Sequence, residues 1–99
     1  MGTPAPAPTE GATVVTVVHA PACHFCADAQ RTLAELARDF PLRVELLDWA
    51  EPRGERLMRD HRASMYPLVL LDGVLFSSGR LPRRKLARLL ATRVATVGA

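Results

Sequence analysis

The stretch of sequence that decides the fold reads TVVTVVHAPACHFC and occupies residues 13–26. Its first part, TVVTVVHA, is mainly β-branched and apolar, as expected for a strand buried on both faces of a sheet. Pro21 ends this strand, and from about Cys23 to Phe40 apolar side chains recur every three to four residues, as on one face of a helix that Pro41 closes. A buried strand therefore leads into an amphipathic helix that begins at a cysteine pair.

The next elements continue the alternation of strand and helix. Residues 42–49 (LRVELLDW) predict a second strand, whose last residue, Trp49, we assign to core or edge packing. Residues 51–62 predict a short charged helix with Pro52 in its first turn. Because a helix connects residues 13–20 to residues 42–49, we expect these two strands to be parallel and joined by a right-handed crossover.

The last third of the chain predicts a hairpin and a final helix. Residues 67–71 and 74–78 are apolar runs joined by Asp72-Gly73, a pair that supplies the positive φ angles of a type I′ turn. Residues 81–97 carry leucine and valine on one face and arginine largely on the other, which indicates an amphipathic helix. The whole pattern is that of a single α/β domain.

Length and composition agree with one globular domain. Of the 99 residues, 48% are hydrophobic and 23% are charged, which is too apolar for a disordered chain. No stretch approaches the roughly 18–20 apolar residues that a membrane span requires. Residues 1–11 alternate proline and alanine without the features of a signal peptide, so we interpret them as a flexible tail before a domain at 12–99. We expect a cytoplasmic monomer that does not bind membranes.

The charge balance is mildly basic. Thirteen lysine and arginine residues face ten aspartate and glutamate residues, giving a net charge of +3. The basic residues concentrate only in residues 80–93, and no nucleic-acid-binding motif accompanies them. We therefore expect no nucleic-acid partner, and we interpret these arginines as a solvated helix face, with a docking patch as the alternative.

Cys23 and Cys26 carry the chemistry that the sequence suggests. A structural disulfide framework is rare in the cytosol, so the pair is interpreted as redox-active or metal-binding. Cys23 lies at a helix start, where amide N–H groups and the helix dipole favour a thiolate by up to ~2 kcal/mol. Cys26 lies on the inner face, where burial favours the thiol. We predict that Cys23 attacks a disulfide and Cys26 resolves the mixed disulfide, with His24 tuning the pKa of Cys23.

Zinc binding is the rival interpretation of the cysteine pair, because His19 and His24 lie close in sequence. Structural zinc normally draws two ligands from each of two separated segments, and no second pair exists in this chain. We therefore expect no resident metal, and we interpret His19 as a packing residue.

Taken together, these features resemble the glutaredoxin branch of the thioredoxin superfamily. The resemblance extends from about Thr13 to Val97 and is carried by the Cys-x-x-Cys at a helix start, Tyr66-Pro67 before a strand, the Asp-Gly hairpin, and Gly79 before the last helix. It implies a thioredoxin-like, glutaredoxin-type fold with a four-stranded mixed sheet flanked by three helices. The implied strand order is 42–49, 13–20, 67–71 and 74–78, with helices 23–40 and 81–97 on one face and helix 51–62 on the other.

The resemblance also implies roles for individual residues. Pro67 would be a cis-proline that faces the cysteine pair, and the backbone of Tyr66 would offer hydrogen bonds to a bound thiol peptide. We place Phe25, Gly79 and Arg80 in the same substrate-binding surface.

Three segments depart from the family pattern. His19-Ala20-Pro21-Ala22 stands where the glutathione groove of the family usually has a lysine shortly before the motif. His24-Phe25 occupies the place of Pro-Tyr in dithiol glutaredoxins and of Gly-Pro in thioredoxins, so the reduction potential of neither branch transfers to this chain. Ser78-Gly79-Arg80 replaces the Gly-Gly and following acidic or hydroxyl residue of the glutathione groove. With Arg83 and Arg84, Arg80 would instead attract an anionic ligand or an acidic partner.

We therefore expect a glutaredoxin-like thiol-disulfide oxidoreductase, active in redox homeostasis and electron transport, that needs no bound cofactor. Its partners would be a disulfide-containing protein or a small thiol compound as substrate, and a partner reductase or small thiol as electron donor. The main alternative is a non-catalytic redox sensor or adaptor in which oxidation of Cys23 and Cys26 changes a surface around Phe25 and the arginine helix. A weak metal-binding thiol protein is the other alternative.

Overall fold

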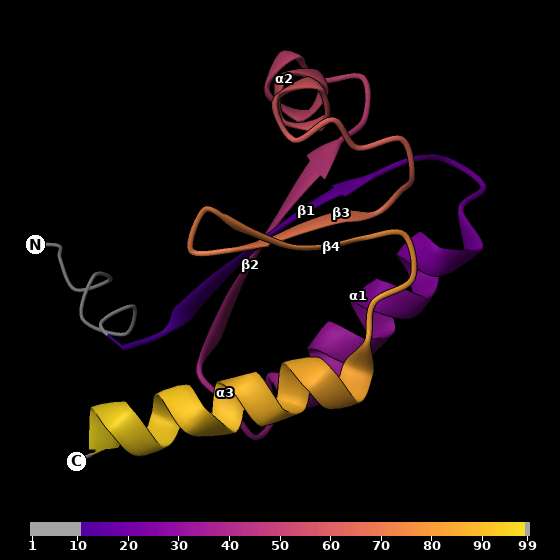
Figure 1. Cartoon of the computed structure of the whole chain (residues 1–99). Coiled ribbons are helices and arrows are strands. Elements are labelled where there is room, and N and C mark those ends of the chain that lie inside the picture. Colours follow the sequence, from indigo (N-terminus) through magenta and orange to yellow (C-terminus); the bar gives the residue numbers. More distant parts are fainter. Residues whose placement is uncertain (1–10, 99) are drawn as a thin grey trace, which may run out of the picture.

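The structure, a computed structural model, describes residues 11–98, with side chains described for residues 11–93. Within these residues the chain forms strands and helices in the predicted order (Figure 1). They are β1 (Thr13–His19), α1 (His24–Leu36), β2 (Leu42–Asp48), α2 (Pro52–Asp60), β3 (Leu68–Leu71), β4 (Val74–Ser78) and α3 (Arg83–Gly98). Except for Gly11, the predicted tail lies outside the described residues.

The strands form one mixed sheet in the order β2-β1-β3-β4, as predicted. β1 and β2 are parallel, with Val17 opposite Leu46, and β1 and β3 are antiparallel, with Val17 opposite Val69. β4 pairs antiparallel with β3 as the outer strand of the hairpin. β1 is therefore hydrogen-bonded along both edges, and its carboxyl end is held in place by its neighbours.

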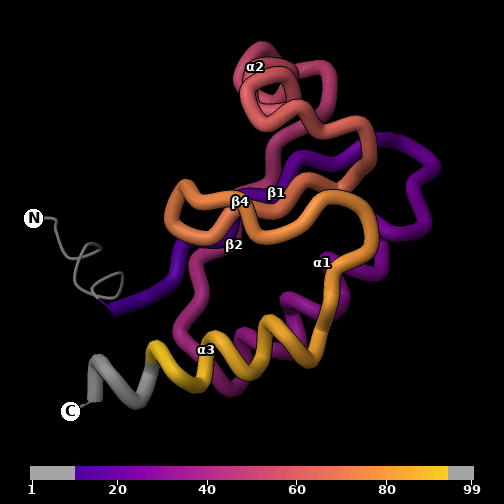
Figure 2. Tube along the Cα trace, viewed as in Figure 1, coloured from indigo at the N-terminus to yellow at the C-terminus, as the bar shows by residue number. Residues whose placement is uncertain are grey.

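The helices cover the two faces of the sheet, with α1 and α3 on one face and α2 on the other (Figures 1 and 2), which confirms the predicted arrangement. Val17 of β1 belongs to a buried cluster with Leu33 of α1 and Leu86 of α3. The next residue, Val18, points to the opposite face because side chains alternate along a strand, and it lies in a second cluster with Met58 of α2. The two clusters fix β1 from both sides.

The Asp72-Gly73 turn has the predicted geometry and ties the hairpin to the rest of the domain. Both residues have positive φ angles, 48° and 84°. The Asp72 carboxylate accepts a hydrogen bond from the Val14 N–H at 2.9 Å and forms an ion pair with Arg93 of α3. Partial burial by itself raises the pKa of Asp72, but the hydrogen bond from Val14 and the interaction with Arg93 outweigh it and hold the pKa below its usual value.

Several predicted boundaries differ from the observed ones, and three of these differences bear on how the chain packs. α1 ends at Leu36, before Phe40, because the residue that precedes Pro41 disfavours helical geometry and the chain closes with a turn. α3 begins at Arg83, although Leu81 before it is still buried in the core. Trp49 lies beyond β2 and is 43% exposed, so it is not a core residue; its N–H continues the sheet by donating to the His19 carbonyl at 2.8 Å.

Candidate functional site

The segment between β1 and α1 brings a cysteine to the first position of the helix. Ala22 adopts a φ of 52°, a left-handed conformation that is uncommon for a residue with a Cβ, and turns the chain out of the strand. Cys23 follows in extended geometry as the N-cap of α1. The predicted position of Cys23 at the helix start is therefore confirmed.

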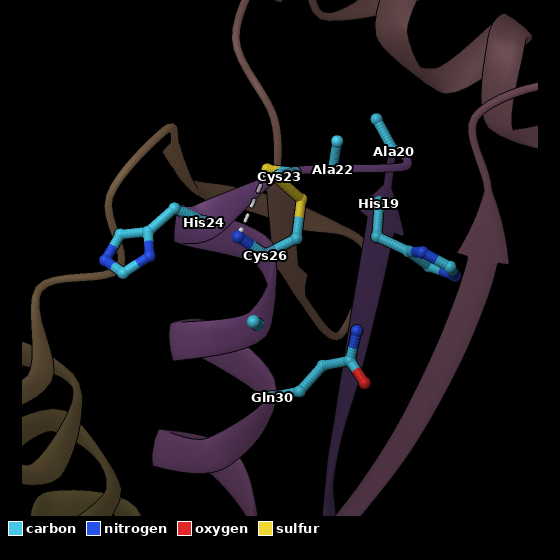
Figure 3. A pocket seen from close by; sticks show the side chains of 8 residues that line it. His19, Ala20, Ala22, Cys23, His24, Cys26 and Gln30 are labelled. Atoms are coloured by element: carbon cyan, nitrogen blue, oxygen red, sulfur yellow. Dashed lines mark hydrogen bonds between the residues drawn. A yellow bond between two sulfur atoms is a disulfide. The ribbon is translucent and has the colours of Figure 1, made fainter.

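Cys23 and Cys26 are joined by a disulfide, with their Cα atoms 5.2 Å apart (Figure 3). The Cys23 Sγ also accepts a hydrogen bond from the Cys26 N–H at 3.1 Å, so it satisfies one of the backbone donors that a helix start leaves without a partner. Cys26 is 3% exposed, whereas Cys23 is only half-buried. The two sulfurs thus differ in solvent access in the sense expected of an attacking and a resolving thiol.

The Tyr66-Pro67 segment lies against the cysteine pair. The peptide bond between these residues is cis, as the family resemblance implied. The Tyr66 carbonyl oxygen lies 3.8 Å from Cys23 Sγ, and the Pro67 carbonyl accepts a hydrogen bond from the Gly79 N–H at 3.0 Å. Residues from three distant parts of the sequence therefore meet at one end of the sheet.

Two exposed apolar side chains belong to this region, and the sequence predicted only one of them. Phe25, between the cysteines, is 38% exposed. Met65 was missed; it is 50% exposed and packs over Gly79, where a Cβ atom would lie 3.3 Å from the Met65 methyl group. The signal available was a methionine two residues before Pro67, but a loop residue gives no periodic pattern from which its exposure follows.

An open hollow of about 660 Å³ adjoins the disulfide (Figure 3). It is lined by His19, Ala20, Ala22, Cys23, His24, Cys26, Ala27 and Gln30. In Figure 3 the ring of His24 extends away from the two sulfur atoms. The centroid of the His24 ring lies 6.3 Å from that of the Phe25 ring. The proposed tuning of Cys23 by His24 stays a prediction.

The part of the chain that the structure describes contains no group of three or more His, Cys, Asp or Glu side chains arranged to hold a metal ion. Among the same residues, no helix combines the length and apolar character needed to span a bilayer.

Arg80 follows Gly79 in the chain and is exposed. It lines a second hollow together with Pro82 and residues of the first turn of α3.

No protein-family profile matches the sequence, and no curated protein matches it. Solved structures do match. An uncharacterized thioredoxin-like protein from Clostridium perfringens aligns with a TM-score of 0.66 at 12% identity, covering 83% of this chain and 71% of that one. Chloroplastic thioredoxin z aligns with a TM-score of 0.66 at 18% identity, covering 88% and 82% of the two chains. A mutant thioredoxin from Halobacterium salinarum gives 0.64 at 19% identity, with coverage of 86% and 77%.

This chain has a thioredoxin-like fold. Its bonded pair, Cys23 and Cys26, has the chemistry to open and close by thiol-disulfide exchange. The neighbours named above are thioredoxins and a thioredoxin-like protein, so the predicted thioredoxin-like fold is confirmed, and the glutaredoxin branch stays a prediction.

Proposed function

We propose that this protein is a glutaredoxin-like thiol-disulfide oxidoreductase that reduces disulfides of proteins or small molecules by a dithiol route. One observation carries the proposal: the Cys23 sulfur caps α1 and accepts the Cys26 N–H, while Cys26 is buried behind it. A hydrogen bond to a thiolate stabilises the charged form, and burial disfavours it. The arrangement therefore favours Cys23 as the nucleophile.

The reduced protein begins the cycle with a Cys23 thiolate and a Cys26 thiol. Cys23 Sγ attacks one sulfur of the substrate disulfide, so a mixed disulfide forms and the other substrate sulfur leaves as a thiolate that takes up a proton. Cys26 then loses its proton and attacks Cys23 Sγ, which releases the second substrate sulfur. The products are the Cys23–Cys26 disulfide and a reduced substrate, with two electrons transferred from protein to substrate.

A partner reductase or a small thiol returns the two electrons. Cys23 is the sulfur that such a donor reaches, because Cys26 is 3% exposed. The donor thiolate attacks Cys23 Sγ, Cys26 leaves and is protonated, and a second donor thiol completes the reduction. In our proposal this cycle runs in a cytoplasmic monomer and needs no resident cofactor.

The segments around Cys23 position the substrate. The Tyr66 carbonyl, 3.8 Å from Cys23 Sγ, lies within reach of the backbone of a peptide whose cysteine is bonded to Cys23. Phe25 and Met65, both partly exposed, offer apolar contact to that peptide. Gly79 lets the Met65 side chain lie against this segment, because a Cβ at Gly79 would come within 3.3 Å of the Met65 methyl group.

A turnover assay with insulin or a mixed disulfide tests the proposal, with single substitutions as matched variants. Cys23→Ser abolishes turnover, because the nucleophile is removed. Cys26→Ser retains the first step and accumulates a covalent mixed disulfide, visible by mass spectrometry. Absence of turnover with glutathione, thioredoxin reductase and other thiol systems, in a protein whose disulfide still forms and opens, would assign the redox-sensor alternative instead.

A further inference from the structure

A strip of exposed cations extends from the cysteine site along α3. We define this cationic strip by Arg80, Arg83, Arg84, Lys85 and Arg88, all of them exposed. Two hollows lie on it: the first is lined by Arg80 and the first turn of α3, and the second by Lys85, Arg88, Leu89 and Thr92. Because Lys85 lines both hollows, the strip is continuous.

Within the part of the chain that the structure describes, most of the positive charge on this strip has no carboxylate partner. Arg83 forms an ion pair with Glu35 of α1. Among the described residues, Arg80, Arg84, Lys85 and Arg88 have no carboxylate within 4.0 Å, and the Lys85 ammonium instead lies 5.4 Å from the centroid of the Phe76 ring. Several positive charges therefore face solvent side by side.

The position of these cations on the helix is also electrostatically unfavourable. The first turn of α3 contains no acidic residue, and cations at a helix N-terminus oppose the positive end of the helix dipole. α2 follows the usual preference, with Glu55 in its first turn and Arg59 in its last. Negative charge from a partner on the strip would offset both the mutual repulsion of the cations and their opposition to the dipole.

The strip begins at the cysteine site. Arg80 follows Gly79, whose N–H donates to the Pro67 carbonyl at 3.0 Å, and the neighbouring Tyr66 carbonyl lies 3.8 Å from Cys23 Sγ. At a rise of 1.5 Å per residue, the helical part from Arg83 to Arg88 covers about 7.5 Å, and Arg80 lengthens the strip toward the site. An extended peptide at about 3.3 Å per residue covers the strip with three or four residues.

We propose that the disulfide substrate is an acidic protein whose aspartate and glutamate side chains, a few residues from its reacting cysteine, dock on the cationic strip. The inference rests on the proposed function and names its substrate class. Opposite charge on substrate and strip accelerates their encounter and fixes the direction in which the substrate backbone passes Cys23.

Three disulfide-bridged peptides of equal length test this inference, with aspartate, serine or lysine at the positions that flank the cysteine. We expect the reduced wild-type protein to reduce the acidic peptide about tenfold faster than the basic one, with the serine peptide between them, and the ratio to fall as salt is added. The double variant Arg84→Glu/Arg88→Glu lowers this acidic-to-basic ratio to one or below.

The matched control is Arg56→Glu/Arg59→Glu, which makes the same change of charge on α2, across the sheet from the strip. Both arginines are exposed, and in the described residues neither has a carboxylate within 4.0 Å. We expect this control to keep the wild-type ratio, with circular dichroism confirming that both variants fold.

Two results would overturn the inference: equal rates for the three peptides with the wild-type protein, or an equal loss of the acidic-to-basic ratio in both double variants. In either case, turnover of the serine peptide would still support the proposed function. Reduction of none of the peptides would overturn both. Tight binding of duplex DNA that is lost only in the α3 variant would assign the strip to nucleic acid and overturn the acidic-protein proposal.

Discussion

Replacing Gly79 by alanine separates the role of this residue in the site from its role in the fold. Gly79 has a φ of 97°, a conformation that residues with a Cβ rarely adopt, and a new Cβ would lie 3.3 Å from the Met65 methyl group. The Met65 side chain is half-exposed and can yield, so the backbone strain dominates. Strain of this kind costs about 1–2 kcal/mol.

The matched control is Gly73→Ala in the β3–β4 turn. Gly73 has a comparable φ of 84°, but a Cβ there would meet no atom within 4 Å. Both variants should therefore lose about 1–2 kcal/mol of the free energy of unfolding, which urea denaturation measures. Only Gly79→Ala should also lower kcat/KM for disulfide reduction, by about two- to tenfold, because displacing Met65 and the Pro67 contact weakens roughly one hydrogen bond to the substrate.

The comparison has a clear refuting result. Equal losses of kcat/KM in Gly73→Ala and Gly79→Ala would show that activity follows global stability. Unchanged kcat/KM in both would show that the segment around Gly79 does not contact the substrate.

Gly54 and Asp72 stabilise the framework that holds the cysteine site. Gly54→Ala should destabilise the protein by about 1–3 kcal/mol, although alanine has the better helix propensity. The reason is that the new Cβ would clash with the backbone carbonyl oxygen of Asp48. A raised melting temperature would refute this prediction. Asp72→Asn keeps a residue suited to the turn and should cost about 0.5–1 kcal/mol at pH 7. Because the pKa of Asp72 is lowered from 3.8, its contribution is present above that pH and is lost as the pH falls through the folded value. The urea midpoints of Asp72→Asn and wild type should converge once the pH lies below the folded pKa of Asp72, and a difference that stays constant with pH would contradict the electrostatic account.

The parts of the fold that follow from local chemistry were predictable. Residues 13–20 do not alternate between apolar and polar side chains, because both faces of β1 are covered. Asp72 and Gly73 adopt the positive φ angles that this pair of residues predicted. The strand order and the cis bond before Pro67 were accessible only through the family resemblance. For the cis bond the reason is that most X-Pro bonds are trans.

The details that escaped prediction depend on contacts between distant segments. Met65 packs over Gly79 because β3 and β4 bring them together, and nothing near Met65 in the sequence indicates this. The pairing of Arg83 with Glu35 likewise depends on α3 lying beside α1, so sequence alone could not separate the paired arginine of the strip from the unpaired ones.

In the proposed function, Cys23 reacts as a thiolate because its sulfur caps α1. The most direct test is the rate at which iodoacetamide alkylates the reduced protein as a function of pH, with the labelled residue identified by mass spectrometry. We predict that Cys23 reacts much faster than free cysteine at pH 7, with a midpoint below that of free cysteine, and that buried Cys26 is labelled far more slowly. A Cys23 that reacts no faster than free cysteine would contradict the account.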